Sequence, residues 1–198
     1  MYQVGITGGI GSGKTLVCSV LESLGVEVYY ADREARRLMN THGTLKRAII
    51  ELLGSRAYSG ELDRRYVASR VFGNRELLEK LNSLVHPVVR EDYRNWVEER
   101  PEGMPYVVEE AAILLESGAS RFLDETVLVY APAELRIRRV MERDGVSREE
   151  VERRMMHQMD EEEKRVLADR VLVNDDREML LPGVVALHQE ILKKTKSL

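Results

Sequence analysis

Several features of known protein classes are missing from this chain of 198 residues. Its one cysteine, Cys18, excludes an internal disulfide and a cysteine-based metal cluster. No apolar run approaches the roughly 20 residues that a membrane-spanning helix needs. The first residues, MYQVGITGG, lack the basic and apolar regions of a signal peptide. We therefore expect a cytoplasmic protein with no membrane partner.

An excess of charge of one sign is also missing. The chain has 30 Lys and Arg against 34 Asp and Glu, a net charge of −4, which gives no reason to expect nucleic acid as a partner. With 5 Pro, 14 Gly and 43% hydrophobic residues, the composition is that of a globular protein and excludes collagen-like and disordered classes. The length suits one domain with a small inserted lobe.

The order of apolar runs predicts an α/β fold. Residues 2–7 form a buried strand that leads into the glycine-rich turn 8–15, and an apolar stripe of helical period follows up to Gly25. A second β-rich run covers 26–30. Strand, turn, helix and strand in this order are typical of a parallel sheet. Further strands are expected at 106–108, 126–130 and 169–173, and a closing helix at 178–194.

Two segments have helical patterns only. Residues 41–100 contain four short helical patterns and no convincing strand, and we interpret them as a helical lobe whose last helix starts at His86-Pro87. Residues 133–165 carry 9 basic and 10 acidic side chains on helical periods. Such a run is typical of a solvated helix pair with i,i+4 ion pairs, and it also suits a mobile lid.

The turn after the first strand matches the pattern G-x-x-x-x-G-K-[ST] with Gly8, Gly13, Lys14 and Thr15. Its backbone N–H groups and the following helix N-terminus bind phosphate, the lysine reaches the β- and γ-phosphates, and the hydroxyl of Thr15 ligates Mg²⁺. The pattern predicts binding of ATP or another nucleoside triphosphate. The expected nucleotide contacts are Gly8, Gly9, Gly11, Ser12, Gly13, Lys14, Thr15 and Leu16.

Three classes of phosphate-binding-loop protein could carry this motif: a GTPase, a transporter ATPase and a small-molecule kinase. The D-x-x-G and N-K-x-D motifs of a GTPase and the L-S-G-G-Q signature of a transporter ATPase are absent from the sequence. A small-molecule kinase needs a carboxylate near the acceptor hydroxyl and arginines that close over the phosphates. Asp32, just past the second strand, should share the carboxyl edge of the sheet with the loop. It is a candidate base, and its alternative role is to cap its own helix.

The chain resembles the dephospho-CoA kinases from residue 3 to about 190. The segments that carry the resemblance, in the same order as in that family, are TGGIGSGKT, ADREAR (31–36), LNSLVHPVVR (81–90), EAAILLESG (110–118), Arg143-Asp144-Gly145 and ADRVLVND (168–175). The resemblance implies a three-layer fold around a central parallel sheet. It divides the single kinase domain into a core (1–40, 104–132 and 166–198), an acceptor lobe (about 41–100) and a lid (about 133–165).

The resemblance also implies the reaction, which is transfer of the ATP γ-phosphoryl group to the ribose 3′-hydroxyl of dephospho-CoA. Asp32 would act as the base, and Lys14, Arg139 and Arg143 would contact the phosphates. The acceptor side would comprise Asp32, Arg36, Asn82, His86, Arg90 and Glu110. Asn174, at the end of the last strand, falls where an adenine contact is expected. The expected partners are ATP, Mg²⁺ and dephospho-CoA, and the chain is expected to be a monomer or a weak homo-oligomer.

The sequence departs from the common family pattern at three places. Tyr30 stands where many members have Asp, Ala112 stands where they have Pro, and Thr15-Leu16 replaces the commoner Ser-Thr. Two alternatives stay open: another phosphate-binding-loop kinase that acts on a nucleotide or a small alcohol, and a binding module that uses ATP without transferring phosphate. The 81–90 and 110–118 segments favour dephospho-CoA, but only through the resemblance.

Overall fold

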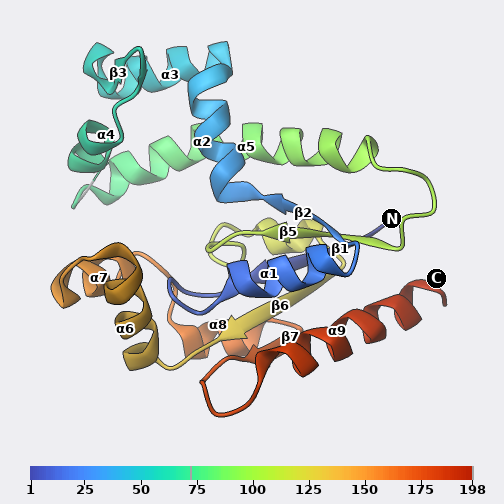
Figure 1. Ribbon diagram of the computed structural model, residues 1–198. Coiled ribbons are helices and arrows are strands. Elements are labelled where there is room, and N and C mark those ends of the chain that lie inside the picture. The colour runs from blue at the N-terminus through green and yellow to red at the C-terminus, as the bar shows by residue number, and fades with distance from the viewer. Residues whose placement is uncertain (72, 198) are drawn as a thin grey trace. The chain divides into compact units, whose positions relative to one another are not determined.

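The computed structural model describes residues 1–71 and 73–197 (Figure 1). The chain divides into two compact units. One unit contains Met1–Tyr30 and the chain from Pro101 onward, and the other contains Ala31–Arg100. Each unit has its own cluster of buried apolar side chains. Within the described part of the chain, no helix has the length and hydropathy needed to cross a membrane.

The first unit is built on a five-stranded sheet in the order β2-β5-β1-β6-β7. The strands are β1 (Tyr2–Thr7), β2 (Glu27–Tyr30), β5 (Tyr106–Glu110), β6 (Glu125–Tyr130) and β7 (Arg170–Val173). All four pairings are parallel. The central strands are buried on both faces, which is why they read as continuous apolar runs in the sequence. The predicted α/β fold with a parallel sheet is confirmed.

Helices cover both faces of this sheet. On one face, α1 (Lys14–Ser23) and α9 (Leu180–Thr195) bury Val17, Leu21, Leu187 and Ile191 against the strands. On the other face, α8 (Glu161–Leu167) contacts β6. The charged segment expected to form a helix pair contains α6 (Ala133–Asp144) and α7 (Arg148–Met155) as well as the start of α8. The result is a three-layer arrangement.

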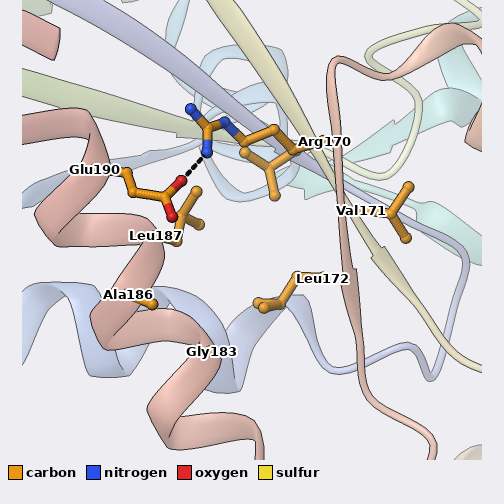
Figure 2. Close-up of a pocket in the computed structure, with 8 residues that line it drawn as sticks. Arg170, Val171, Leu172, Gly183, Ala186, Leu187 and Glu190 are labelled. Atoms are coloured by element: carbon orange, nitrogen blue, oxygen red, sulfur yellow. Dashed lines mark hydrogen bonds and ion pairs between the residues drawn. The ribbon is translucent and has the colours of Figure 1, made fainter.

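The edge strand β7 is joined to α9 by charge as well as by apolar packing. A groove of about 370 Å³ runs between them, and Figure 2 shows the Arg170 guanidinium paired with the Glu190 carboxylate along it. A Cβ on Gly183 would lie 2.9 Å from Leu172, so the helix and the strand approach closely below this pair.

The second unit is mainly helical. Its helices are α2 (Ala31–Thr41), α3 (Gly43–Leu53), α4 (Arg64–Val71) and α5 (Arg75–Glu98), with a 3₁₀ turn at Ser55–Ala57. The strands β3 (Tyr58–Ser59) and β4 (Glu61–Leu62) form a small antiparallel hairpin. The expectation of no strand in 41–100 was therefore wrong. Two residues per strand are too few to show an alternating pattern in the sequence. The helical pattern 62–72 ends on residue 72, outside the described residues.

The helix start predicted at His86-Pro87 was also wrong. Pro87 lies inside α5, a continuous helix of 24 residues. A proline inside a helix removes one backbone hydrogen bond and disfavours the preceding turn. In α5 that cost is offset by Leu81, Val85 and Tyr93, which are buried on either side of the proline. His86 is therefore a mid-helix residue.

Candidate active site

The glycine-rich turn forms an open cup between β1 and α1. Gly13 precedes α1 with a left-handed φ of 104°, and no side chain caps the helix. The first N–H groups of α1 are thus available to an anion, and the helix dipole adds positive potential. Gly8 is required by close packing, since a Cβ there would lie 2.4 Å from the carbonyl oxygen of Val129. Gly11 has the same constraint against the carbonyl oxygen of Arg136, at 2.6 Å.

Lys14 lies across this cup. Its Nζ donates a hydrogen bond to the Gly8 carbonyl oxygen at 2.9 Å and lies 3.7 Å from Glu110 Oε1. Both side chains are about nine-tenths buried, with 11% and 9% exposed. Glu110 ends β5, next to β1 in the sheet, so the parallel register brings this carboxylate to the loop. The Lys14 ammonium therefore lies beside the helix N-terminus, with its charge balanced by the Glu110 carboxylate.

The residues on either side of Lys14 differ in exposure. Ser12 is fully buried and its hydroxyl has no hydrogen-bond partner among the described residues. Thr15 and Leu16, in the first turn of α1, are exposed. The hydroxyl of Thr15 is therefore accessible to a ligand. Leu16 is 56% exposed, with no polar atom in its side chain.

Asn174 and Arg139 hold the loop from outside the cup. Asn174 Nδ2 donates to the Ser12 carbonyl oxygen at 2.7 Å, and Arg139 donates to the Asn174 carbonyl oxygen at 3.1 Å. Arg139 also bonds Asp176 Oδ1 at 2.5 Å. Asn174 was expected to contact adenine and Arg139 to contact phosphate. Both roles stay predictions, and in this structure both side chains bind the loop or its surroundings.

Arg143 lies in the last turn of α6 and is 61% exposed. Its Nε donates to Asp144 at 2.7 Å, and Arg154 donates to the same carboxylate at 3.0 Å. The hydrogen bond from Arg143 lowers the pKa of Asp144 and raises that of the guanidinium. These ion pairs lie at the surface and contribute little free energy, so the arginines can leave Asp144 and bind a phosphate at little cost.

The remaining candidates belong to the second unit. Asp32 and Arg36 are exposed residues of α2, and Asp32 is in its first turn. Asp32 is the second residue of α2, which begins at Ala31, so it does not occupy the N-cap position that was its alternative role. Asn82, His86 and Arg90 are half-buried in α5 at intervals of four, which places them along one face of that helix. Burial, and then the charge of Arg90, lower the pKa of His86.

Comparison with known proteins identifies the family. Residues 2–179 match the sequence model of CoaE, dephospho-CoA kinase. The chain is 46% identical to a dephospho-CoA kinase of Salinibacter ruber, over 88% of this chain and 89% of that one. This chain belongs to the dephospho-CoA kinase family. Its fold is similar to that of dephospho-CoA kinase from Campylobacter jejuni, with a TM-score of 0.67, 26% identity and coverage of 97% and 98% of the two chains.

A second solved structure is more similar to this member of the dephospho-CoA kinase family. It is the protein TT1252 from Thermus thermophilus, with 41% identity, a TM-score of 0.82 and coverage of 96% and 97% of the two chains. The matches extend over both compact units and over the loop, so the resemblance found in the sequence is confirmed for the whole chain.

Sequence reasoning missed several residues that surround the loop. The Arg136 guanidinium and Glu161 Oε1 would lie 2.3 and 2.8 Å from a Cβ on Gly9, and Gln158 accepts the N–H of Ile10. These residues belong to the charged segment 133–165, for which the sequence predicted only helices. The fold brings them next to the loop, and no local pattern in the sequence marks them.

Proposed function

We propose that this chain is a dephospho-CoA kinase that transfers the γ-phosphoryl group of ATP to the ribose 3′-hydroxyl of dephospho-CoA, giving coenzyme A and ADP. The match of residues 2–179 to the dephospho-CoA kinase family carries this proposal. The open N-terminus of α1 and the Lys14 ammonium supply the phosphate-binding chemistry that the reaction needs.

In this reaction the acceptor oxygen forms a bond to the γ-phosphorus while the bond from that phosphorus to the β–γ bridging oxygen breaks. The electron pair leaves with ADP, and we assign the hydroxyl proton to Asp32. Lys14 and the loop N–H groups offset the negative charge on the phosphates. We assign Arg143 to the transferred group and Arg139 to the nucleotide side. Since phosphoryl transfer needs little covalent help, most of the catalysis is positioning.

Magnesium is proposed as the metal of this site, held by Thr15. The hydroxyl of Thr15 is exposed in the first turn of α1, next to the cup. No cluster of three or more metal-ligating side chains occurs among the described residues, which fits Mg²⁺ because this ion usually takes most of its ligands from phosphate and water. When bound, Mg²⁺ would neutralise charge on the β- and γ-phosphates.

The unit Ala31–Arg100 is proposed to bind the acceptor through Asp32, Arg36, Asn82, His86 and Arg90, with Glu110 from the first unit. This unit has 14 Lys and Arg against 11 Asp and Glu, whereas the whole chain is negative. A positive lobe suits an acceptor that carries a diphosphate group. The lid at about 133–165, a cytoplasmic location and a monomeric or weakly associated state complete the proposal.

The test is a coupled assay with Mg-ATP that offers dephospho-CoA beside adenosine, AMP and shikimate, with product mass measured. We expect ADP release with dephospho-CoA and a product that is heavier by one phosphoryl group. Turnover with another alcohol and none with dephospho-CoA would overturn the acceptor assignment. Tight binding of ATP without turnover of any acceptor would favour a binding module.

A further inference from the structure

The first half of the phosphate-binding loop is bound by a residue from the distant part of the chain. The Ile10 N–H donates a hydrogen bond to Gln158 Oε1 at 2.9 Å. Ile10 also packs against Ile137, Val140 and Val151 of α6 and α7. A phosphate-binding loop works through the directions of its N–H groups, so a fixed Ile10 amide constrains the path of the residues around it.

Gln158 is itself held in place by the backbone on both sides. Its own N–H donates to the Met155 carbonyl oxygen at 2.9 Å, which continues the last turn of α7. The next N–H, that of Met159, donates to Glu116 Oε1 at 3.0 Å. The Gln158 side chain therefore starts from a backbone position that is bonded to α7 and to the segment after β5.

A buried ion pair anchors this backbone. Lys164 is fully buried, and its Nζ lies 2.9 Å from the same Glu116 oxygen and donates to the Ala112 carbonyl oxygen at 3.3 Å. It also lies 3.5 Å from Glu161 Oε1. A buried ammonium is costly unless it is paired, so Lys164 and Glu116 hold each other and the segment 158–164 in one arrangement.

We propose that Gln158 is a positioning residue of the phosphoryl-transfer site, which orients the Ile10 amide for nucleotide binding, and that the Lys164–Glu116 ion pair holds Gln158 in place. This inference rests on the proposed function, because it concerns the loop that would bind ATP. The alternative is that the contact only packs the segment onto the loop.

The first experiment compares Gln158→Met with the wild-type chain. The change keeps the length of the side chain and removes the acceptor oxygen. The loss of one such hydrogen bond corresponds to a change of about five- to tenfold in a binding constant. We expect the Kd for ADP, measured by calorimetry, and the KM for ATP to rise by this factor. The KM for dephospho-CoA should stay unchanged, and the thermal midpoint should fall by only a few degrees, because one hydrogen bond is lost. Met156→Ala is the matched control, since Met156 is 74% exposed and lies two residues earlier.

An unchanged Kd for ADP in Gln158→Met, or an equal rise in Met156→Ala, would overturn the proposal. The calorimetric measurement does not depend on the acceptor. If wild type binds ADP but fails to phosphorylate dephospho-CoA, the proposed function fails while the positioning role is still measured.

The second experiment tests the anchor. The variant replaces all three charged side chains, Lys164→Met with Glu116→Leu and Glu161→Gln, because Glu161 is also buried next to Lys164 and would otherwise keep an unpaired charge. We expect this triple variant to fold and to lose as much affinity for ADP as Gln158→Met does. Adding Gln158→Met to it should change the Kd by less than about twofold, because residues that act as a unit are not additive. Independent, multiplied losses would show that Gln158 works without the anchor.

Discussion

Asp32 stands at a position where its charge has two effects. It is exposed in the first turn of α2, where a carboxylate interacts favourably with the helix dipole. An exposed carboxylate can also accept a proton from an alcohol that is held near it. The first effect concerns stability and the second concerns rate, so one substitution separates them.

The change Asp32→Asn should lower kcat by about 100-fold or more, a typical contribution of a general base. The Kd for ADP should change little, because the nucleotide is assigned to the loop. The thermal midpoint should fall only slightly, since Asn is also favourable at a helix N-terminus. Steady-state assays measure kcat, and calorimetry on the same preparation measures the Kd and the thermal midpoint. A near-normal kcat would show that Asp32 is only a helix residue.

At the residue scale, a short sequence motif can mark residues of one loop, but it cannot mark the distant residues that contact the loop. Gly8, Gly13, Lys14 and Thr15 are fixed by a short motif, and the structure places them in one cup. Gln158 could not be found in this way. Its partner Ile10 is 148 positions away, and only the folded chain brings the two together.

At the scale of elements, one buried carboxylate joins four segments of the first unit. Glu125, the first residue of β6, is 3% exposed. It accepts hydrogen bonds from Tyr2 Oη of β1 and Lys194 Nζ of α9, both at 2.9 Å, and pairs with Arg170 of β7. Burial alone would raise the pKa of Glu125. The hydrogen bonds from Lys194, Tyr2 and Arg170 outweigh it, and the pKa is lowered.

The change Glu125→Gln should therefore destabilise the first unit without affecting catalysis. We expect a loss of about 2 kcal/mol in the free energy of unfolding, less than for a fully buried pair because Arg170 and Lys194 are partly exposed. A lowered pKa stabilises the fold above the unfolded value, so the difference from wild type should shrink as pH falls below 4.5. Urea titrations at several pH values measure this.

Glu190→Gln is the matched control for that experiment. Glu190 pairs with the same Arg170 but is 56% exposed, so its loss should cost well under about 1 kcal/mol. An equal loss in both variants, or a changed KM for ATP in Glu125→Gln, would contradict the assignment of Glu125 to structure alone.

Elements that form continuous apolar runs in the sequence were predicted well. Elements whose bounds depend on packing were not. The strands 2–7 and 126–130 appear within a residue of their predicted bounds, because a buried parallel strand is a continuous apolar run. The helix start at Pro87 failed because the local rule for proline was given more weight than the apolar stripe Leu81, Val85 and Tyr93. Burial of that stripe stabilises α5 across the proline.

At the scale of the whole molecule, the chain contains two units with separate apolar cores. The core of the first unit includes Val4, Ile6 and Leu21, and that of the second includes Ile49 and Leu81. The chain passes between the units at Tyr30–Ala31 and at Arg100–Pro101. The nucleotide contacts proposed here all belong to the first unit, and most of the proposed acceptor contacts belong to the second.

This division predicts where a nucleotide stabilises the chain. A ligand at about 100 times its Kd adds about 2.7 kcal/mol to the stability of the part that binds it. Saturating ADP should therefore slow amide hydrogen exchange in β1, α1 and β6 far more than in α3 and α5. Exchange measured by mass spectrometry on peptides from each unit checks this, with Lys14→Met as the control that should remove the protection. Equal protection of both units by ADP would show that they open as one cooperative body, and the acceptor side would then sense the nucleotide before any acceptor is bound.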